Sequence, residues 1–571
     1  MKFYDQITPK IPERIEEKRA HIIGSGIAGL AAAVYLVQEA KMPGRNITIY
    51  EARPNLGGCL EAFGSTEDGY LSTGAREPEP YFQCMWELCS RIPSLEEPGK
   101  TVLDETVEFN KKYPIYCNTR FLERQGKVDE TQHQMELDPE NGMKLMQLLM
   151  TPDKDLENVS LADWFGEDYF ESNMWKDFST KLAFQKWDSA MEMKQYIHRF
   201  LHLGEGSELH KGILHFKYNE YDSLGKPIVV YLENQGVQFR TGTEVTDVAL
   251  KDEEGQTSVT ALTVRHEGRE ETIAITADDY VFLTSGSMIQ NTAYGDTHTV
   301  APVNGDKQNR GCFTLWEKLA AHDEKFGHPE KFISDVDKTQ WISFSLTIRD
   351  YPELIAAMEK LTSDYDGCAG LMTFKDSSWC LSTYVQHQPF FPEQPENVQF
   401  IWNYGLHPWN TGDYVRKPMS ECTGEEILTE MLYHLGLKDK IAEILPHCTV
   451  RTAMMPYITS QFMPRQAGDR PEVIPEGCTN LALMGQYLET GDVVFTVETS
   501  IRSAMMAVYG LLDLQKPVIP VASTKFDIRV ISSMIRYATG NGRTLPEELP
   551  PLTGSQLRDI LTTIPAFAED I

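Results

Sequence analysis

The sequence is organised around a stretch that begins Lys18-Arg-Ala-His-Ile-Ile-Gly-Ser-Gly-Ile-Ala-Gly-Leu-Ala-Ala-Ala33 and continues with Ile47-Thr-Ile-Tyr-Glu51, Gly57-Gly58 and Gly74-Ala-Arg-Glu77. The apolar run 20–23 predicts a buried parallel strand, and the Ala-rich run after it predicts a helix. Between them, Gly24, Gly26 and Gly29 form the G-x-G-x-x-G pattern of a dinucleotide-binding turn.

Each glycine of this turn has its own task. Gly24 permits the tight turn, Gly26 lets the backbone approach a pyrophosphate, and Gly29 lets the helix lie close to the strand, so that phosphates meet the positive end of the helix dipole. The second predicted strand, 47–49, ends at Glu51, whose carboxylate would accept ribose hydroxyls and repel a 2'-phosphate. A glycine-rich turn without a ligand is the alternative, but strand, turn, helix, strand and acid in this order favour the dinucleotide.

The segment after Glu51 selects the dinucleotide. Arg53-Pro-Asn-Leu-Gly57-Gly58 resembles the loop of flavoprotein oxidases and desaturases, which favours FAD over NAD. We therefore predict an α/β protein with a Rossmann-like FAD-binding domain. The predicted FAD contacts are Gly24, Gly26, Ile27, Ala28, Gly29, Glu51, Ala52, Gly57, Gly58, Arg76, Glu77, Val245, Ser285, Gly286, Gly485, Phe495 and Thr496.

Composition restricts the functional class. The chain has 571 residues, 41% of them hydrophobic, and a formal net charge of -31, which argues against nucleic acid as a partner because a polyanion would be repelled. The ten cysteines form no C-x-x-C pair and no Cys/His ligand spacing, so we predict reduced thiols in a cytoplasmic protein and no metal site. The first residues lack the apolar core of a secretory signal, and the longest apolar run, Ile27 to Val37, is too short to span a membrane.

The order of the predicted elements divides the chain. Asp278 to Ser287 predicts a strand that runs into a small-residue turn, and Leu481 to Tyr487 followed by Phe495 to Ala504 predicts a strand, a loop and a helix. We expect these segments to return to the FAD domain, which is then discontinuous. The predicted division is an arm at 1–17, the FAD domain at 18–92, 225–300 and 470–516, mixed α+β substrate-binding regions at 93–224 and 301–469, and a C-terminal helical segment at 517–571.

The two substrate-binding regions differ in pattern. Residues 100–214 predict mostly helices, including an aromatic-rich helical pair at 181–187 and 190–201. Ser160 with Asp163 three residues later is a helix-start signal. The alternating segments 341–348, 378–385 and 398–403 predict an antiparallel sheet that would form a substrate chamber over the flavin.

The last fifty residues differ in charge from the rest of this acidic protein. One helical face carries Ile528, Ile531, Met534 or Ile535, and Ala538, while Lys525, Arg529, Arg536 and Arg543 supply basic charge. This pattern fits either a helix packed on the body of the protein or a helix that contacts an anionic membrane reversibly.

Several motifs together resemble one family. They are the Gly74 to Glu77 loop, Ser90-Arg-Ile-Pro-Ser-Leu-Glu96, Met193-Lys-Gln-Tyr196, Lys217-Tyr-Asn-Glu-Tyr-Asp-Ser223 and Arg416-Lys-Pro-Met-Ser-Glu-Cys-Thr-Gly-Glu-Glu426. With them the chain closely resembles, over nearly its whole length, the oleate (fatty-acid) hydratases, once called myosin-cross-reactive antigens. The resemblance implies an enzyme that adds water across an isolated cis double bond of a free unsaturated fatty acid, with no net redox change. It also implies FAD that works best reduced, a homodimer, and a cytoplasmic location at the inner face of the cell membrane.

The resemblance assigns two catalytic residues. Hydrating an unactivated alkene needs a proton donor on one carbon and a base-directed water on the other. Glu77 occupies the position of the family's essential glutamate, which orients or deprotonates the water, and Tyr196 that of the proposed proton donor. Without the resemblance, Glu77 would be interpreted as a surface ion pair beside Arg76, and Tyr196 as an ordinary helix-face tyrosine.

Two segments depart from the family pattern. The loop Thr73-Gly-Ala-Arg-Glu-Pro-Glu-Pro-Tyr81 stands where the family has Arg-Gly-Gly-Arg-Glu-Met, and Tyr384-Val385-Gln386 stands where the family has the Thr-Val-Asn that grips the substrate carboxylate. We predict that Tyr384 and Gln386 bind this carboxylate and that the larger Tyr384 shortens or redirects the channel. The alternatives are a flavin redox enzyme, such as a fatty-acid isomerase, a desaturase or an amine oxidase, and a lipid- and membrane-binding flavoprotein that has lost turnover.

Overall fold

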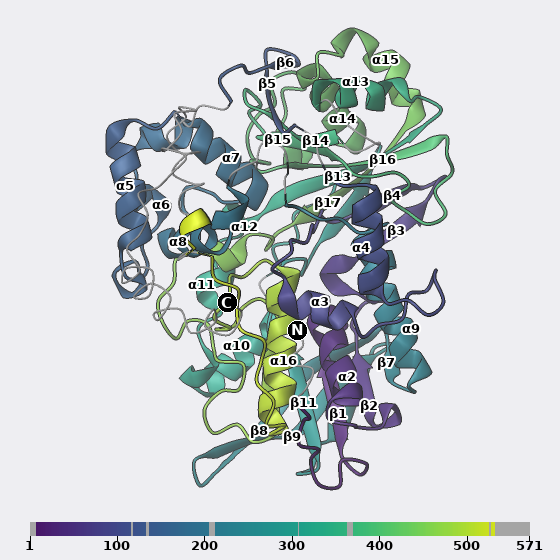
Figure 1. The fold of residues 1–571 in the computed structure, drawn as a ribbon, viewed down its shortest axis with the longest axis vertical. Helices are drawn as coiled ribbons and strands as arrows, with labels where there is room; N and C mark the ends of the chain where they lie inside the picture. Colours follow the sequence, from purple (N-terminus) through teal and green to yellow (C-terminus); the bar gives the residue numbers. More distant parts are fainter. Residues whose placement is uncertain are drawn as a thin grey trace, which may run out of the picture.

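The structure is a computed structural model that describes residues 7–115, 118–132, 136–204, 210, 212–306, 308–362, 369–524 and 527–530. Figure 1 shows a parallel sheet with its helices at one end, a large mixed sheet at the other, and a group of helices beside the mixed sheet. Most of the predicted membrane-contacting helix falls on 531–571, outside the described residues. Within the described ranges, no helix is both long enough and apolar enough to cross a bilayer.

A five-stranded parallel sheet holds the dinucleotide turn. Its strands lie in the order β18 (Leu481–Met484), β11 (Asp279–Thr284), β1 (Arg19–Ile23), β2 (Ile47–Tyr50) and β7 (Gln238–Arg240). The two helices α2 (Ile27–Gln38) and α16 (Val497–Leu511) lie side by side against it (Figure 1). Because these strands come from the first, middle and last parts of the chain, residues far apart in sequence meet at the carboxyl edge of one sheet.

An antiparallel hairpin region and several helices complete this half. The three-stranded antiparallel sheet consists of β8 (Thr243–Glu253), β9 (Gln256–His266) and β10 (Arg269–Ala274). The surrounding helices are α3 (Gln83–Cys89), α4 (Val102–Lys112), α9 (Lys226–Asn234), α10 (Cys312–His322), α11 (Glu330–Ile333) and α12 (Val336–Thr339).

The second half is built on an eight-stranded mixed sheet. Its order is β12 (Ala293–Asp296), β17 (Cys448–Met455), β13 (Trp341–Arg349), β16 (Val398–Gly405), β15 (Leu381–Val385), β14 (Ala369–Phe374), β5 (Arg120–Glu123) and β6 (Lys127–Val128). The predicted antiparallel strands are confirmed. The prediction missed the other five strands, β12, β17, β14, β5 and β6. For β5 the reason is that a four-residue strand with a charged residue at each end has no clear period, and this strand is held by parallel pairing with β14.

Strand β13 has two buried faces with different chemistry. Ile342, Phe344, Leu346 and Ile348 pack in the core beneath α13 (Glu353–Thr362) and α14 (Gly424–His434), beside the short α15 (Ile441–Ile444). The opposite face carries small hydroxyl residues.

Those hydroxyls hold the strand that leads into the site. Ser345 Oγ accepts a hydrogen bond from Ser72 N at 3.0 Å, and Thr347 Oγ1 accepts one from Tyr70 N at 2.8 Å. Tyr70 and Ser72 belong to β4 (Gly69–Ser72), which pairs with β3 (Ala62–Ser65). The loop 73–81 therefore starts from a strand fixed on the mixed sheet.

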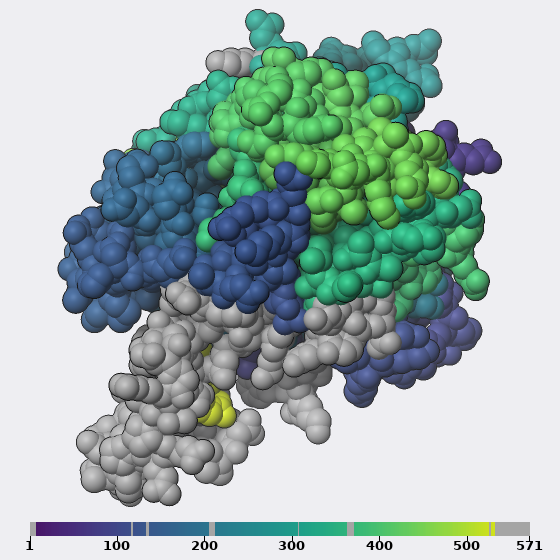
Figure 2. Space-filling model, turned by 90° about the horizontal axis from the view of Figure 1, so that it is seen from above, coloured from purple at the N-terminus to yellow at the C-terminus, as the bar shows by residue number. Residues whose placement is uncertain are grey.

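The helical segment contains α5 (Pro139–Met150), α6 (Leu161–Trp164), α7 (Asn173–Leu182) and α8 (Ala190–Arg199), drawn in blue at the left of Figure 2. The predicted helix start at Ser160 is confirmed by its capping box with Asp163. The helix predicted over 181–187 is wrong: α7 ends at Leu182, because Ala183 adopts a left-handed φ of 64°. A turn between Gln185 and Asp188 then leads to α8, whose first turn is capped by the Ser189 side chain.

Candidate active site

The glycine turn is shaped as its sequence predicts. Gly24 has a φ of 99°, in the left-handed region that favours glycine. A Cβ on Gly29 would lie 2.1 Å from the carbonyl oxygen of Gly24, so only glycine allows α2 to lie this close to β1. A Cβ on Gly26 would meet nothing nearer than Gly58 Cα at 4.0 Å, so the turn is open on this side.

The open side of the turn fits a pyrophosphate. Gly57 forms a bridge with Gly26, and both Gly57 and Gly58 have positive φ, so the two bare backbone turns face each other. At the end of the neighbouring β11, Thr284 Oγ1 and Ser285 Oγ are buried without a hydrogen-bond partner in the described part of the chain. Buried hydroxyls without partners beside an open glycine turn are what an oxygen-rich ligand such as FAD would satisfy.

Glu51 follows β2 and is held beside the glycine turn by hydrogen bonds. One carboxylate oxygen accepts hydrogen bonds from Ser25 N at 3.0 Å and Ser25 Oγ at 2.6 Å, and the other accepts one from Arg53 N at 3.0 Å. Thr243 N donates to Glu51 O at 2.8 Å, which brings β8, with the buried Val245, beside this acid. The carboxylate thus lies where a ribose would be recognised.

The other predicted FAD residues surround the same edge. Ile27 and Ala28 are buried in the first turn of α2, whereas Ala52 is exposed after β2. Gly286 and Gly485 follow β11 and β18, and a Cβ on Gly485 would lie 3.6 Å from Gly286 O. Phe495 and Thr496 precede α16, where Phe495 has a φ of 68° and Thr496 caps the helix.

A large cavity lies next to this edge, with a volume of about 410 Å³. Its wall is mostly apolar and aromatic, and it includes Phe121, Phe178, Met288, Trp341 and Trp402. The predicted site residues on the wall are Arg76, Glu77, Tyr196, Tyr384, Phe495 and Thr496. The structure therefore brings both catalytic candidates and part of the predicted flavin loop to one cavity.

Glu77 lies on the cavity wall with Tyr384, whose hydroxyl donates a hydrogen bond to its carboxylate. Arg76 is engaged elsewhere: its backbone N donates to Glu220 Oε1 at 2.6 Å and its guanidinium to Gly74 O at 3.1 Å. Burial raises the pKa of Glu77 to about 8, although the Tyr384 hydrogen bond opposes this shift. In the described structure Glu77 is thus not the surface ion pair that its neighbour suggests.

Tyr196 lies on α8 and is almost fully buried between Phe184 and Phe462. Its hydroxyl donates a hydrogen bond to Val494 O. Burial raises the pKa of Tyr196 well above its ordinary value, so the phenol keeps its proton at neutral pH.

Tyr384 and Gln386 do not lie together on the large cavity. Tyr384 contacts Glu77 and lines both the large cavity and a second, small cavity of about 20 Å³, whereas Gln386 is on the wall of the small cavity alone. Both side-chain amide atoms of Gln386 are buried and lack a hydrogen-bond partner in the described ranges. His215 lines the same small cavity, and burial lowers its pKa to about 4, so it is neutral.

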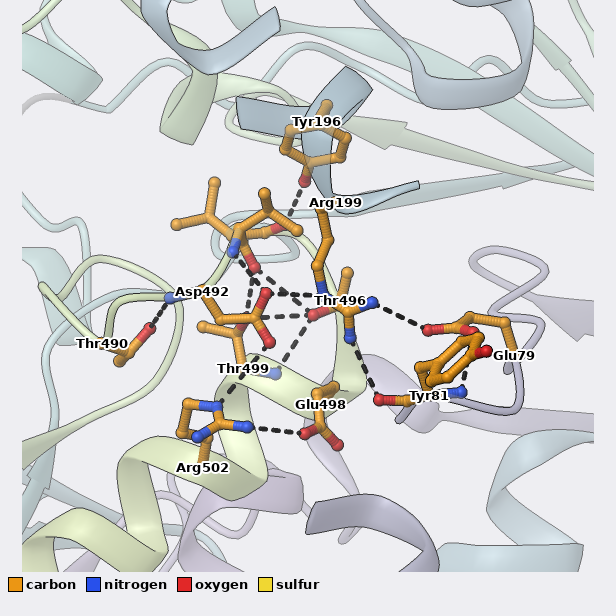
Figure 3. A network of polar contacts seen from close by, with 12 residues as sticks. Glu79, Tyr81, Tyr196, Arg199, Thr490, Asp492, Thr496, Glu498, Thr499 and Arg502 are labelled. Carbon is orange, nitrogen blue, oxygen red and sulfur yellow. Dashed lines mark hydrogen bonds and ion pairs between the residues drawn. The ribbon is translucent and has the colours of Figure 1, made fainter. Parts of the chain in front are cut away.

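A set of charged residues that the sequence patterns did not single out lies beside the cavity, and one of them, Glu79, is part of its wall. Arg199, Glu79 and Asp492 form buried ion pairs that join α8, the loop 73–81 and the segment before α16 (Figure 3). Their positions in the sequence offered one clue, because two of these charged residues lie close to a catalytic candidate. Arg199 follows Tyr196 by three residues on one helix, and Glu79 follows Glu77 by two. Neither spacing alone indicates that the two side chains meet.

A separate polar cluster lies under the mixed sheet. His434 Nε2 is 3.3 Å from Asp413 Oδ2 and 3.4 Å from Glu430 Oε1, and its Nδ1 is 3.5 Å from Asp376 Oδ1. Burial lowers the pKa of His434, but the hydrogen bonds and charges of the carboxylates outweigh it and raise that pKa to about 9. Glu430 also accepts backbone N–H groups of residues 413–415, so this cluster holds an imidazolium and a loop in place.

Comparison with known proteins identifies the family. The model of the MCRA family matches residues 17–509. The chain belongs to the MCRA family. This confirms the resemblance that the sequence motifs indicated.

Two relatives match over most of their length. An oleate hydratase of Streptococcus pyogenes serotype M49 (strain NZ131) is 38% identical over 554 residues, which are 95% of this chain and 93% of the relative. A linoleate hydratase of Lactiplantibacillus plantarum is 30% identical over 535 residues, covering 86% of this chain and 93% of the relative.

A solved structure of a putrescine oxidase variant has a TM-score of 0.50 with 12% sequence identity, over 87% of this chain and 99% of that chain. At this identity the likeness concerns the fold alone, and it agrees with the predicted α/β class.

Gly26→Val separates folding from FAD binding in this MCRA protein. The structure leaves open space at a Gly26 Cβ, so we expect the variant to fold with the wild-type circular dichroism spectrum while its side chain fills the place of the pyrophosphate. Purified Gly26→Val should then lack the flavin absorbance that the wild type shows after addition of FAD. Stoichiometric FAD in the variant would show that the pyrophosphate does not lie at this turn.

Proposed function

We propose that this chain is an FAD-dependent fatty-acid hydratase that adds water across an isolated cis double bond of a free unsaturated fatty acid of the oleate or linoleate type. The observation that carries the proposal is the presence of Glu77 and Tyr196, an acid with a pKa near neutrality and a protonated phenol, on one largely apolar cavity. The relatives named as oleate and linoleate hydratases support the same reaction class, a hydro-lyase.

The cavity suits an alkyl chain. Its volume of about 410 Å³ falls within the usual range for small-molecule sites, roughly 300–1,000 Å³. Phenylalanine, tryptophan, methionine and leucine side chains would exclude water from the hydrocarbon. The polar wall residues come from several segments and include Glu77, Arg120, Asn173 and Lys181. A double bond held near Glu77 would be protected from bulk solvent and open to one directed water.

Glu77 is proposed as the group that directs the water. A general base works best when its pKa lies near the operating pH, and burial places the pKa of Glu77 at about 8. The hydroxyl of Tyr384 holds the carboxylate in one orientation. Glu77 would take a proton from the water as the water oxygen bonds to one alkene carbon.

Tyr196 is proposed as the proton donor. Its phenol proton would pass to the other alkene carbon. The phenolate would then regain a proton from solvent while Glu77 releases to solvent the proton that it took from the water, so the reaction consumes one water and no electrons. Bound FAD would supply a polarising ring to the site, held by Gly24, Gly26, Gly57, Gly58 and Glu51.

The small cavity behind Glu77 is proposed as the place of the reacting water. A cavity needs roughly 10–15 Å³ of free volume to hold one water, and this one has about 20 Å³. Gln386 offers an amide donor and an amide acceptor whose partners are missing from the described residues. A water between Gln386 and Glu77 would satisfy both, so Gln386 is proposed to hold water instead of the substrate carboxylate.

The assembly and location that the family resemblance implies belong to the proposal. We propose a cytoplasmic homodimer whose C-terminal segment, with Arg529 and the basic residues after it, contacts the anionic inner face of the cell membrane. The exposed Ile528 fits an apolar contact next to that basic charge.

Hydration in labelled water tests the proposed function. Purified protein with FAD and a reductant should convert oleate or linoleate into a hydroxy fatty acid, and heavy-oxygen water should place one heavy oxygen in the product, as read by mass spectrometry. Glu77→Gln should abolish product formation while it keeps FAD bound, because an amide cannot accept the proton.

Three outcomes of the same assay would contradict the proposed function or the proposed role of Glu77. Absence of a labelled hydroxy acid across several unsaturated fatty acids would exclude a hydratase. Flavin bleaching by the fatty acid without added reductant would indicate a redox enzyme instead, and full activity of Glu77→Gln would remove Glu77 from the mechanism.

Gln386→Leu distinguishes a water ligand from a carboxylate ligand. Leucine has a similar size but no hydrogen-bonding atoms, so loss of a water ligand should lower kcat by about 10-fold or more, in the range of a positioned proton-transfer partner, and leave KM nearly unchanged. Steady-state kinetics with oleate measure both constants. A raised KM with an unchanged kcat would show instead that Gln386 binds the substrate carboxylate, as the family pattern predicts.

A further inference from the structure

One buried guanidinium ties together the three segments that carry the site. Arg199 is buried on α8, and Figure 3 shows it between the loop that holds Glu79 and the segment that holds Asp492. Its Nε pairs with Asp492 Oδ1 at 2.9 Å, its Nη1 pairs with Glu79 Oε1 at 3.0 Å, and its Nη2 donates to Tyr81 O at 3.2 Å. Each of the three guanidinium nitrogens of Arg199 therefore contacts a different group.

Each of these partners adjoins a residue of the proposed chemistry. Glu79 and Tyr81 stand two and four residues after Glu77, on the same loop. Arg199 itself stands one helical turn after Tyr196 on α8. The contacts of Arg199 thus join the segment of the water-directing acid to that of the proton donor.

The third segment is the one before α16. Asp492 stands two residues before Val494, whose carbonyl accepts the hydrogen bond from Tyr196. The next residues, Phe495 and Thr496, lie on the cavity wall and were predicted to contact FAD. Arg199 therefore also links Tyr196 to the hydrogen-bond acceptor that orients its phenol.

The remaining contacts hold this arrangement rigid. The second oxygen of Glu79 lies 3.1 Å from His202 Nε2 and accepts a hydrogen bond from Tyr81 N at 2.8 Å. Arg502 lies 3.7 Å from Asp492 and 3.1 Å from Glu498, whose carboxylate receives the backbone N–H groups of residues 84 and 85 on α3. The network thus fixes the loop after Glu77 at Glu79 and again where α3 begins.

We propose that Arg199 is a positioning residue that sets the placement of Glu77 relative to Tyr196, through Glu79 on one side and Asp492 on the other. This inference rests on the proposed function, in which those two side chains act on opposite carbons of one double bond. A planar guanidinium with fixed donor directions holds two carboxylates and a carbonyl at set angles, whereas an ammonium behaves as a point charge. The buried guanidinium of Arg199 therefore fixes the relative positions of its three partners, which the ammonium group of a lysine cannot do.

Arg199→Lys tests this role because it keeps the positive charge and removes the planar guanidinium with its fixed donor directions. We expect kcat for hydration to fall about 10- to 100-fold, since a displacement of about 1 Å between reacting groups can cost 100-fold. The KM for oleate and the bound FAD should stay near wild-type values, because the apolar wall and the glycine turn are unchanged. Crystal structures of the FAD-bound wild type and variant should show the loop 73–81 displaced relative to α8.

Arg465→Lys is the matched control. Arg465 pairs with Glu192 on the same helix α8, at 2.9 Å and equally buried, but the structure records no contact of Arg465 with the loop 73–81 among the described residues. Its kcat should stay within about 2-fold of wild type. An equal loss of kcat in Arg465→Lys would reduce the effect of Arg199→Lys to general destabilisation of the helix and overturn the inference.

Glu79→Gln gives a second test if Arg199→Lys does not fold. Glutamine keeps the side-chain length and one oxygen acceptor while it removes the charge that orients Arg199, so kcat should again fall with KM unchanged. A wild-type kcat in this variant, or a loop in its wild-type place in the crystal structure, would overturn the inference. The position of the loop 73–81 shows whether Arg199 places it even if the wild type does not hydrate fatty acids. Absence of hydration by the wild type would count against the proposed function alone.

Discussion

The burial of the Glu77 carboxylate against the Tyr384 hydroxyl is the interaction on which the proposed site depends. In water a glutamate is ionised at neutral pH and would bind solvent from all sides. Here burial raises its pKa to about 8, and one hydrogen bond fixes its orientation. The same side chain lines both the large, mostly apolar cavity and the small cavity that Gln386 also lines.

The fold maintains this burial through contacts between segments that are distant in sequence. Hydroxyls on one face of β13 hold β4, from which the loop of Glu77 starts, while β15 of the same sheet supplies Tyr384. The parallel sheet brings the glycine turn and the start of α16 to the other side of the cavity. Because a buried charge without a partner is costly, removing either partner of an Arg199 ion pair would destabilise this junction.

The sequence predicts the parts of this arrangement that depend on local patterns. The glycine turn, the strand before Glu51 and the alternating strands of the mixed sheet follow from residue type and spacing, and the family motifs indicate Glu77 and Tyr196. Contacts such as Tyr384 with Glu77, 307 residues apart, follow only from the folded chain. The end of α7 was missed for a related reason, since the left-handed Ala183 is stabilised by tertiary packing, against its high helix propensity.

The titration of Glu77 tests the central claim most directly. Infrared difference spectra of the FAD-bound wild type against Glu77→Gln would isolate the band of the protonated Glu77 carboxyl, and its intensity would be followed across pH. The structure predicts that this band disappears with a midpoint near pH 8, because burial favours the neutral acid. A midpoint near the ordinary glutamate pKa of 4.5 would contradict the account, since Glu77 would then be a solvated carboxylate.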